Sequence, residues 1–221
     1  MVFELWWRTK AAGQRMQADL PPLIAILRGV KPIEVVEIAT ALVEAGIRGI
    51  EVPLNSPEPF ESLRRLSAAV GEKCVCGAGT VLEPSQVDQV RDAGGSLVVS
   101  PNVDVSVIER SVELGLIPVP GFATATEAFT AIKAGARHLK LFPAATYGVQ
   151  HITALRAVLP PSVAIFAVGG VGPTAIGQWL RAGVAGFGIG GELYRPGQDA
   201  RTVGERAGAL VAALRAAANE T

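Results

Sequence analysis

Short apolar runs recur along the chain roughly every 20–25 residues, a spacing that suits compact strand-plus-helix units. Most of these runs lack alternating polar residues, which is the pattern of strands buried on both faces. We therefore predict eight strands, at Leu23–Leu27, Gly49–Leu54, Cys74–Gly79, Leu97–Ser100, Ile117–Pro120, His138–Phe142, Ala164–Val168 and Gly186–Ile189.

The stretches between these runs carry their apolar positions on one face, as amphipathic helices do. They include Ile33–Glu44, Phe60–Val70, Ser85–Asp92, Val105–Leu114 and Thr174–Arg181. Glycine just past a helix end takes the left-handed conformation, which would strain a Cβ. We predict this role for the glycines that close five helix-like stretches, namely Gly46, Gly94, Gly115, Gly135 and Gly183.

Eight strand–helix units without a break in composition predict an α/β fold of the (β/α)8 or TIM-barrel type. A doubly wound open sheet is the structural alternative, although it would more often show six strands or fewer. Residues 1–18 precede the first predicted strand, and we expect them to form an extra helix that closes the barrel floor. No linker or low-complexity segment divides the chain, so we predict a single domain over residues 1–221.

The charges of the 221-residue chain cancel, with 20 Lys and Arg against 20 Asp and Glu. No charge field therefore indicates nucleic acid or an anionic membrane as a partner. Hydrophobic residues make up 49% of the chain, yet no apolar run approaches the ~18–20 residues of a membrane-spanning helix. The N-terminus lacks the apolar core of a signal peptide, and we expect a cytoplasmic protein.

Candidate metal ligands are few. His138 and His151 are the only histidines, and no carboxylates cluster with them at ligand spacing, so the sequence predicts no protein-built zinc site. Cys74 and Cys76 lack the two-residue spacer of metal or redox pairs and indicate strand packing instead. In a barrel of this type, function is expected on the loops that follow the strands.

Lys140 differs from the other four lysines because it lies inside the apolar run His138–Phe142. Burial disfavours the ammonium ion and lowers its pKa. An amine with a pKa of about 7 would be half neutral at pH 7, and a neutral amine can attack a carbonyl group to form a Schiff base. The alternative for this residue, taken alone, is an ion pair inside the barrel.

Glu51 is the only carboxylate embedded in the interior of a predicted strand. Taken alone, a buried glutamate is either a salt-bridge partner or a general base. The second and sixth strands face each other across an eight-stranded barrel, so inward-pointing Glu51 and Lys140 are expected to converge on one axis. A carboxylate of raised pKa beside a neutral amine is the acid–base pair that carbonyl chemistry requires.

Two glycine pairs follow the last two predicted strands, Gly169–Gly170 and Gly190–Gly191. Turns without side chains let backbone N–H groups approach an anion. The loops after strands 7 and 8 are also where TIM barrels commonly hold phosphate. A single pair would indicate a tight turn only, whereas two pairs on adjacent strands favour a phosphate site.

Six motifs then occur in order and in register from about Leu20 to the C-terminal helix: Ile26–Gly29, Ile50–Pro57, Gly77–Leu82, Ser100–Asn102, Leu139–Ala144 and Val168–Val171. Together they resemble the 2-keto-3-deoxy-6-phosphogluconate/6-phosphogalactonate aldolase family. The resemblance implies a class I aldolase on a (β/α)8 barrel, metal-free and without a cofactor, usually assembled as a homotrimer. Its small-molecule partners would be a phosphorylated keto-deoxy sugar acid, pyruvate and glyceraldehyde 3-phosphate.

The resemblance also implies roles for individual residues. Lys140 matches the Schiff-base lysine and Glu51 the general acid–base. Arg28 and Thr80 match positions that hold the pyruvate-side carboxylate, and Phe142 matches the aromatic residue that packs against the bound carbonyl region. The phosphate-binding turns of the family match Gly169, Gly170, Gly190 and Gly191.

Two details favour the galactonate branch of the family. The segment Pro53–Pro57 contains Asn55, whereas the gluconate enzymes usually carry Thr-Leu-Arg-Thr there. Val168 stands where the gluconate enzymes usually place Thr, and a methyl in place of a hydroxyl would shift the preference for the C4 epimer. We expect Asn55 and Val168 to pack against the substrate. One departure is Gly191, which replaces the usual Ser and removes a hydroxyl donor worth ~1 kcal/mol of phosphate affinity, unless water fills in.

The predicted reaction is cleavage of 2-dehydro-3-deoxy-6-phosphogalactonate to pyruvate and D-glyceraldehyde 3-phosphate. The nearest alternative is an aldolase for the gluconate epimer, or for both epimers. Phosphosugar isomerases and decarboxylases use similar barrels, but the decarboxylase pattern Asp-x-Lys-x-x-Asp is absent around Lys140. The non-catalytic alternative is a phosphometabolite-binding barrel in which Lys140 and Glu51 form a buried pair.

Overall fold

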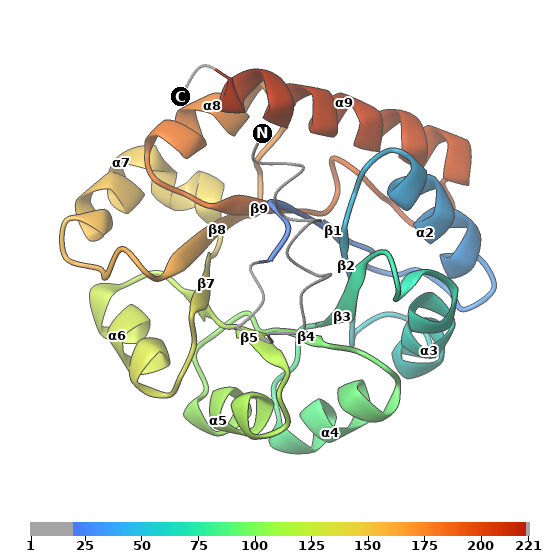
Figure 1. Ribbon diagram of the computed structural model, residues 1–221, viewed down its shortest axis with the longest axis horizontal. Helices are drawn as coiled ribbons and strands as arrows, with labels where there is room; N and C mark the ends of the chain where they lie inside the picture. The colour runs from blue at the N-terminus through green and yellow to red at the C-terminus, as the bar shows by residue number, and fades with distance from the viewer. Residues whose placement is uncertain (1–19, 220–221) are drawn as a thin grey trace.

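The computed structural model describes residues 20–219, so the helix predicted for residues 1–18 lies outside the described residues. A parallel sheet curls into a barrel, and the helices form a ring around it (Figure 1). All eight predicted strands are present. The strands are β1 (Leu23–Ile26), β2 (Gly49–Pro53), β3 (Val75–Gly79), β4 (Leu97–Val99), β5 (Ile117–Val119), β6 (Gly121–Phe122), β7 (His138–Leu141), β8 (Ala164–Val168) and β9 (Gly186–Ile189).

The additional strand β6 lies just beyond the fifth predicted strand, Ile117–Pro120, and Pro120 separates it from β5. β5 pairs with β4, whereas β6 pairs with β7. Proline has no N–H to donate, but the Pro120 carbonyl accepts a hydrogen bond of 2.9 Å from the Lys140 N–H. Because β5 and β6 are one stretch of chain, the strand order β5-β4-β3-β2-β1-β9-β8-β7-β6 closes on itself. The barrel prediction is confirmed, and the open-sheet alternative is wrong.

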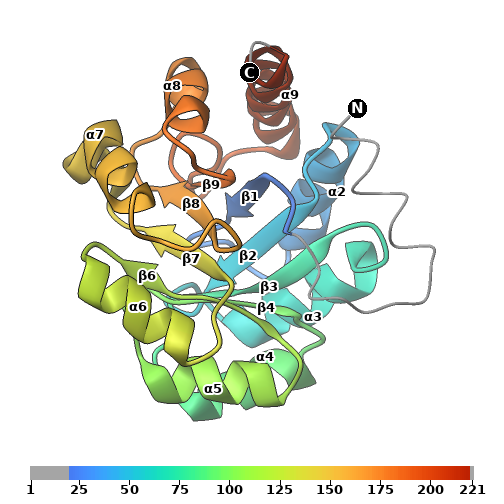
Figure 2. The ribbon, with the colours of Figure 1, turned by 60° about the vertical axis from the view of Figure 1, so that its left-hand side comes forward.

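The helices lie outside the strands in Figure 2, where the tilt of the strands is visible. They agree with the predicted amphipathic stretches to within a few residues. None of the described helices is long and apolar enough to cross a membrane. The helices are α2 (Val35–Glu44), α3 (Pro59–Val70), α4 (Pro84–Asp92), α5 (Val105–Glu113), α6 (Ala125–Lys133), α7 (Ala144–Arg156), α8 (Ile176–Arg181) and α9 (Ala200–Ala218).

Local sequence sets both ends of these helices. Asp104 begins α5 by accepting hydrogen bonds from two backbone N–H groups of the first turn, and Thr124 begins α6 through a reciprocal capping box with Glu127. The predicted left-handed glycines are confirmed, because all five have positive φ. Their φ angles are 105° at Gly46, 82° at Gly94, 70° at Gly115, 107° at Gly135 and 95° at Gly183.

Two apolar layers lie on opposite faces of the strands. The larger layer joins strands to helices and includes the fully buried Leu63, Ile108 and Phe187. The smaller layer fills the barrel interior and explains why most strands are apolar on both faces. Its buried members are Leu20, Ile24, Ile26, Val75, Leu97, Val99, Val119, Phe166 and Val168.

Candidate active site

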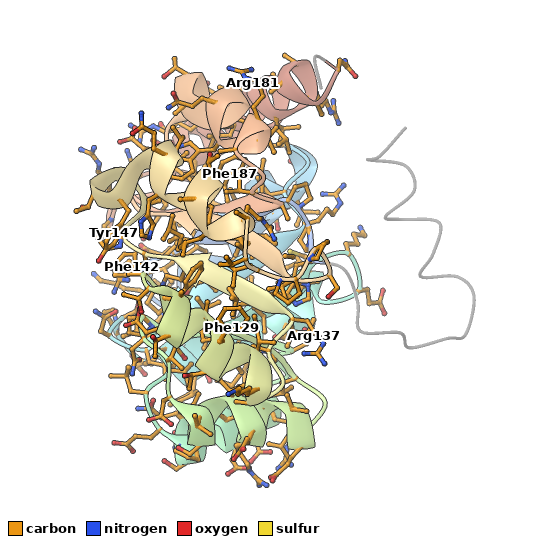
Figure 3. All side chains as sticks on the ribbon, turned by 90° about the vertical axis from the view of Figure 1, so that its left-hand side faces the viewer. Phe129, Arg137, Phe142, Tyr147, Arg181 and Phe187 are labelled. Atoms are coloured by element: carbon orange, nitrogen blue, oxygen red, sulfur yellow. The ribbon has the colours of Figure 1, made fainter. Side chains whose placement is uncertain are left out.

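Most of the predicted site residues lie on the loops at the carboxyl ends of the strands, and in a parallel barrel these ends share one face. Strand β7 shows the direction. In Figure 3, Arg137, just before β7, lies at one edge of the molecule, and Phe142, just after it, lies at the opposite edge. Three of the other predicted residues, Glu51, Lys140 and Val168, lie within their strands. The rest follow the carboxyl end of a strand: Arg28, Asn55, Thr80, Gly169, Gly170, Gly190 and Gly191.

Strand register turns Glu51 and Lys140 into the barrel interior. Glu51 pairs with Ile26, and Lys140 pairs with Phe166. Residues directly paired in neighbouring strands point to the same face of a sheet. Ile26 and Phe166 belong to the interior layer, so Glu51 and Lys140 point inward with them. The predicted convergence of the two groups inside the barrel is confirmed.

The Lys140 side chain is buried and lies beside an aromatic ring. Its residue is 6% exposed, and its Nζ lies 4.6 Å from the centroid of the Phe142 ring. Burial lowers the pKa of the Lys140 amine, the negative charge of Glu51 opposes this shift, and Arg28 adds to it. The net direction favours the neutral amine, which is the nucleophilic form.

Glu51 is buried more completely, at 2% exposed. Burial raises the pKa of the Glu51 carboxyl to about 7, although the positive charges of Lys140 and Arg28 lower it in part. Its Oε2 has no hydrogen-bond partner among the described residues. A carboxyl group with this pKa is present in both protonation states near neutral pH and can therefore both donate and accept a proton.

Glu51 and Lys140 do not form the buried ion pair of the non-catalytic alternative. Across residues 20–219, no nitrogen–oxygen distance of 4.0 Å or less joins the Lys140 amine to the Glu51 carboxylate. The two groups influence each other's pKa without direct contact. A substrate carbonyl would need this separation in order to fit between a nucleophile and a general acid–base.

Gly79 is the residue that makes room for the Glu51 carboxylate. A Cβ placed on Gly79 would lie 2.0 Å from Glu51 Oε2 and 2.5 Å from Oε1, far inside van der Waals contact. Any larger residue at the end of β3 would therefore displace the carboxylate. This role of Gly79 was not predicted, because a contact between β2 and β3 has no signature in either segment alone.

Arg28 and Asn55 form a hydrogen-bonded pair at the mouth of the barrel. Arg28 follows β1, Asn55 follows β2, and Arg28 Nη1 donates to Asn55 Oδ1 at 2.6 Å. The next residues reinforce this contact, because the Gly29 N–H donates to Ser56 Oγ at 2.9 Å. The loops after β1 and β2 are thus fastened together, with the Arg28 guanidinium exposed at their junction.

Thr80 follows Gly79 in a strained conformation. Its φ of 57° lies in the left-handed region, which is unfavourable for a β-branched residue. Such strain costs ~1–3 kcal/mol and is most often found at functional sites. The residue that follows is held by two hydrogen bonds, because the Val81 N–H donates to the Val99 carbonyl and Ser100 Oγ donates to the Val81 carbonyl.

Phe142 connects the amine to the first glycine turn. Its side chain is 39% exposed, and a Cβ on Gly169 would lie 3.5 Å from its ring. Val168, just before this turn, is buried at 6% exposed and points into the barrel interior. The sequence of contacts from Lys140 through Phe142 to Gly169 runs from the barrel axis to the rim.

Both glycine turns lie at this rim. Gly169 and Gly170 have φ angles of 96° and 73°, which favour glycine, and the Val168–Gly188 register sets the turns after β8 and β9 side by side. Across residues 20–219, the N–H groups of Gly170 and Gly191 donate to no protein acceptor. Unpaired backbone N–H groups in adjacent turns are the arrangement that binds phosphate in many proteins.

Arg195 is a second residue that the sequence analysis missed. It follows the turn after β9, and its Nε donates to the Gly191 carbonyl at 3.2 Å. No sequence pattern singled it out, since exposed arginines are common.

As for metals, residues 20–219 contain no group of three or more His, Cys, Asp or Glu side chains arranged to hold an ion.

Known proteins match this sequence over most of their length. A family model described as KDPG and KHG aldolase matches residues 15–200. The chain is 50% identical over 196 residues to 2-dehydro-3-deoxy-6-phosphogalactonate aldolase of Escherichia coli (strain K12), covering 89% of this chain and 96% of the relative. It is 47% identical over 192 residues to a probable enzyme of the same name from Rhizobium meliloti (strain 1021), covering 87% and 91%.

Solved structures agree with the sequence comparisons. A structure described as native KDPGal matches with a TM-score of 0.89 at 48% identity, covering 93% of this chain and 100% of that chain. A cube-shaped, highly porous protein cage, designed by fusing symmetric oligomeric domains, matches with a TM-score of 0.89 at 49% identity, covering 90% of this chain and 74% of that chain.

Proposed function

The chain belongs to the KDPG and KHG aldolase family, and we propose that it cleaves 2-dehydro-3-deoxy-6-phosphogalactonate to pyruvate and D-glyceraldehyde 3-phosphate. The observation that carries this proposal is the pair of buried groups inside the barrel, a lysine whose pKa is lowered and a glutamate whose pKa is raised to about 7. This pair supplies the nucleophile and the proton shuttle of a class I aldolase.

The first half of the proposed reaction forms the Schiff base. The neutral amine of Lys140 attacks the C2 ketone of the substrate and gives a carbinolamine. Glu51 donates a proton to the departing C2 hydroxyl, which leaves as water, and an iminium ion links C2 to Nζ. The carboxyl pKa of about 7 supports this role because much of Glu51 is protonated near neutral pH.

The second half breaks the carbon–carbon bond. Glu51, now a carboxylate, removes the proton of the C4 hydroxyl directly or through a water molecule. The C3–C4 bond breaks, its electron pair moves into the iminium to form an enamine, and C4 becomes the aldehyde of glyceraldehyde 3-phosphate. Protonation of the enamine at C3 and hydrolysis of the resulting imine release pyruvate and regenerate the Lys140 amine.

Other residues of the rim hold the substrate in this proposal. Arg28 and Thr80 bind the carboxylate of the pyruvate half, while Phe142, Asn55 and Val168 pack against the carbon chain. The positive charge of Arg28 beside the site supports the first assignment. The unpaired N–H groups of the glycine turns support phosphate binding by the remaining members of the site: Gly169, Gly170, Gly190 and Gly191.

The galactonate epimer is proposed over the gluconate epimer for two reasons. The two curated relatives described above are both named for the galactonate substrate. Val168 also places a methyl group, without a hydroxyl, beside the first glycine turn. Steady-state kcat/KM values for the two purified epimers test the preference, and a higher value for the gluconate epimer would overturn it.

We further propose a cytoplasmic homotrimer that needs no metal or cofactor. The match to a cage built from symmetric oligomeric domains supports an oligomer. Pyruvate release from the substrate in the presence of EDTA tests metal independence: full activity is expected, and an activity that EDTA abolishes and added metal restores would contradict the class I mechanism.

Borohydride trapping is the direct test of the Schiff base. Reduction in the presence of pyruvate should attach three carbons to Lys140, as peptide mapping by mass spectrometry would show. Lys133→Ala is the matched control, because Lys133 is an exposed lysine at the end of α6 and its loss should leave trapping intact. Trapping that persists in Lys140→Ala, or an adduct on another lysine, would defeat the assignment.

A further inference from the structure

We propose that Arg195 is a phosphate ligand of this site and supplies the donor that Gly191, in place of serine, does not provide. The inference rests on the proposed function, because it concerns the phosphate of the same substrate. It adds a charged side chain to a subsite whose other members offer only backbone N–H groups.

The turn after β9 brings Arg195 back over the glycines. The N–H groups of Leu193 and Tyr194 both donate to the Gly190 carbonyl, at 2.8 and 2.9 Å. This tight turn returns the chain toward its start, and Arg195 Nε donates to the Gly191 carbonyl at 3.2 Å. The guanidinium is therefore held beside the residue whose own N–H is unpaired at the rim.

The backbone of Arg195 is fixed by Gln198. The Arg195 N–H donates to Gln198 Oε1 at 2.8 Å, and the Gln198 N–H donates to the Arg195 carbonyl at 3.1 Å. Arg206, on α9, donates to the same Gln198 oxygen at 3.2 Å. A guanidinium on a fixed backbone loses less freedom when it binds a ligand than one on a loose loop does.

The charge of Arg195 is not neutralised by the protein. Within residues 20–219, no carboxylate lies within 4.0 Å of its guanidinium, and its terminal nitrogens Nη1 and Nη2 have no hydrogen-bond partner. By contrast, the exposed arginines that do form ion pairs mostly pair with an acid of their own helix, as Arg201 does with Glu205. Arg195 thus keeps the planar pair of donors that matches a phosphate group.

The position also fits the length of the substrate. The amine of Lys140 marks C2, and the contacts through Phe142 to Gly169 lead to the rim. C6, which carries the phosphate, is four carbons from C2 and reaches this rim in an extended substrate. Arg28, another cation of the rim, already donates to Asn55. Arg195 has free terminal nitrogens beside Gly191, at the phosphate end.

The first test compares phosphorylated with unphosphorylated substrate. In Arg195→Ala, we expect the ratio of kcat/KM for 2-dehydro-3-deoxy-6-phosphogalactonate to kcat/KM for 2-dehydro-3-deoxygalactonate to fall about 10- to 100-fold, mostly through KM for the phosphorylated compound. Competitive inhibition by inorganic phosphate should weaken in parallel. Arg201→Ala, which removes another exposed arginine, should leave the ratio as in the wild type.

The second test uses the open space at Gly191. A Cβ there would meet no atom within 4 Å, so serine fits without displacing a neighbour. Gly191→Ser should recover several-fold of the lost phosphate affinity in the Arg195→Ala background and add less in the wild type, because the two donors serve one ligand. Equal gains in both backgrounds would show that a donor at position 191 and Arg195 act independently, and would overturn the inference that Arg195 stands in for the missing serine.

Failure of this inference differs from failure of the proposed function. If Arg195→Ala lowers kcat/KM equally for both substrates, the residue only shapes the turn, and the inference is wrong while the aldolase activity stands. An unchanged ratio overturns it as well. If the wild type cleaves neither substrate, the proposed function itself fails.

Discussion

At the scale of single residues, the site depends on two ionisable groups kept in an apolar barrel. Burial raises the pKa of Glu51 and lowers that of Lys140, and each shift favours the uncharged form. The neutral forms are the ones that begin the proposed reaction. The protein accepts a less stable fold at these positions, because an ordinary interior residue would cost less to bury.

Replacing Glu51 by glutamine tests whether this carboxyl group carries protons in the reaction. The amide has nearly the same shape but neither donates nor accepts a proton at neutral pH. We expect kcat to fall about 10²- to 10⁴-fold while the fold is retained. Pyruvate release measures the rate, and circular dichroism checks the fold. A variant with wild-type turnover would exclude Glu51 as the proton shuttle.

The same variant tests whether burial of the Glu51 carboxyl group lowers the stability of the fold, through the pH dependence of unfolding. The unfolded Glu51 carboxyl titrates near 4.5 and the folded one near 7. Between these values the native state binds more protons than the unfolded state, so the Glu51 contribution to stability falls as pH rises through this window and stays low above it. The free energy of unfolding of Glu51→Gln, relative to the wild type, should therefore be higher by about 3 kcal/mol at pH 8 than at pH 4.5.

Urea unfolding of both proteins at pH 4.5, 6 and 8 measures this difference. The gap between their free energies of unfolding should widen with pH. A constant gap would mean that burial does not perturb the carboxyl group.

Asn55 has a positioning role that can be measured separately. It accepts from Arg28, so Asn55→Ala should free the guanidinium and raise KM about three- to tenfold, with a smaller change in kcat. Since Arg28 lowers the pKa of both Glu51 and Lys140, the pH profile of kcat/KM should also move. Arg91→Ala, which removes an exposed side chain hydrogen-bonded to Asp92, should change neither. If KM and the pH profile are unchanged in Asn55→Ala, the contact with Asn55 does not position Arg28 for the reaction.

At the scale of elements, strand packing decides where these groups point. The Glu51–Ile26 and Lys140–Phe166 pairings turn both groups inward, and Gly79 gives the carboxylate its space. Periodicity and glycine spacing predicted every strand except β6, and also the left-handed helix ends, because those signals are local. The break at Pro120 was not predicted, since it depends on the change of pairing partner from β4 to β7.

A matched pair of glycine-to-alanine changes tests this packing. Gly79→Ala puts a methyl group 2.0 Å from Glu51 Oε2, so activity should fall by about 10²-fold as the carboxylate moves. Gly208→Ala, in the middle of α9, meets no atom within 4 Å and should stabilise the protein by about 0.5–1 kcal/mol with full activity. Full activity in Gly79→Ala would show that the carboxylate position is not critical.

At the scale of the whole molecule, closure of the ring makes every strand–helix unit a neighbour of two others. We propose that the chain is therefore one domain that unfolds in a single transition. Circular dichroism and tryptophan fluorescence should give coincident unfolding curves, and sedimentation should give three times the chain mass of 22.9 kDa. Separate unfolding transitions would contradict the single domain, and a monomer mass would contradict the trimer.

The sequence by itself determined the repeating units, the ends of the helices, the fold class and the two residues proposed for catalysis, because each leaves a local mark: a period, a glycine, or a charge in an apolar run. Only the tertiary structure decided the closure through Pro120, the contact of Gly79 with Glu51, the hold of Asn55 on Arg28 and the place of Arg195 beside Gly191. These features join segments that are distant in the chain or turn back on themselves, and their chemistry exists only where the fold brings the atoms together.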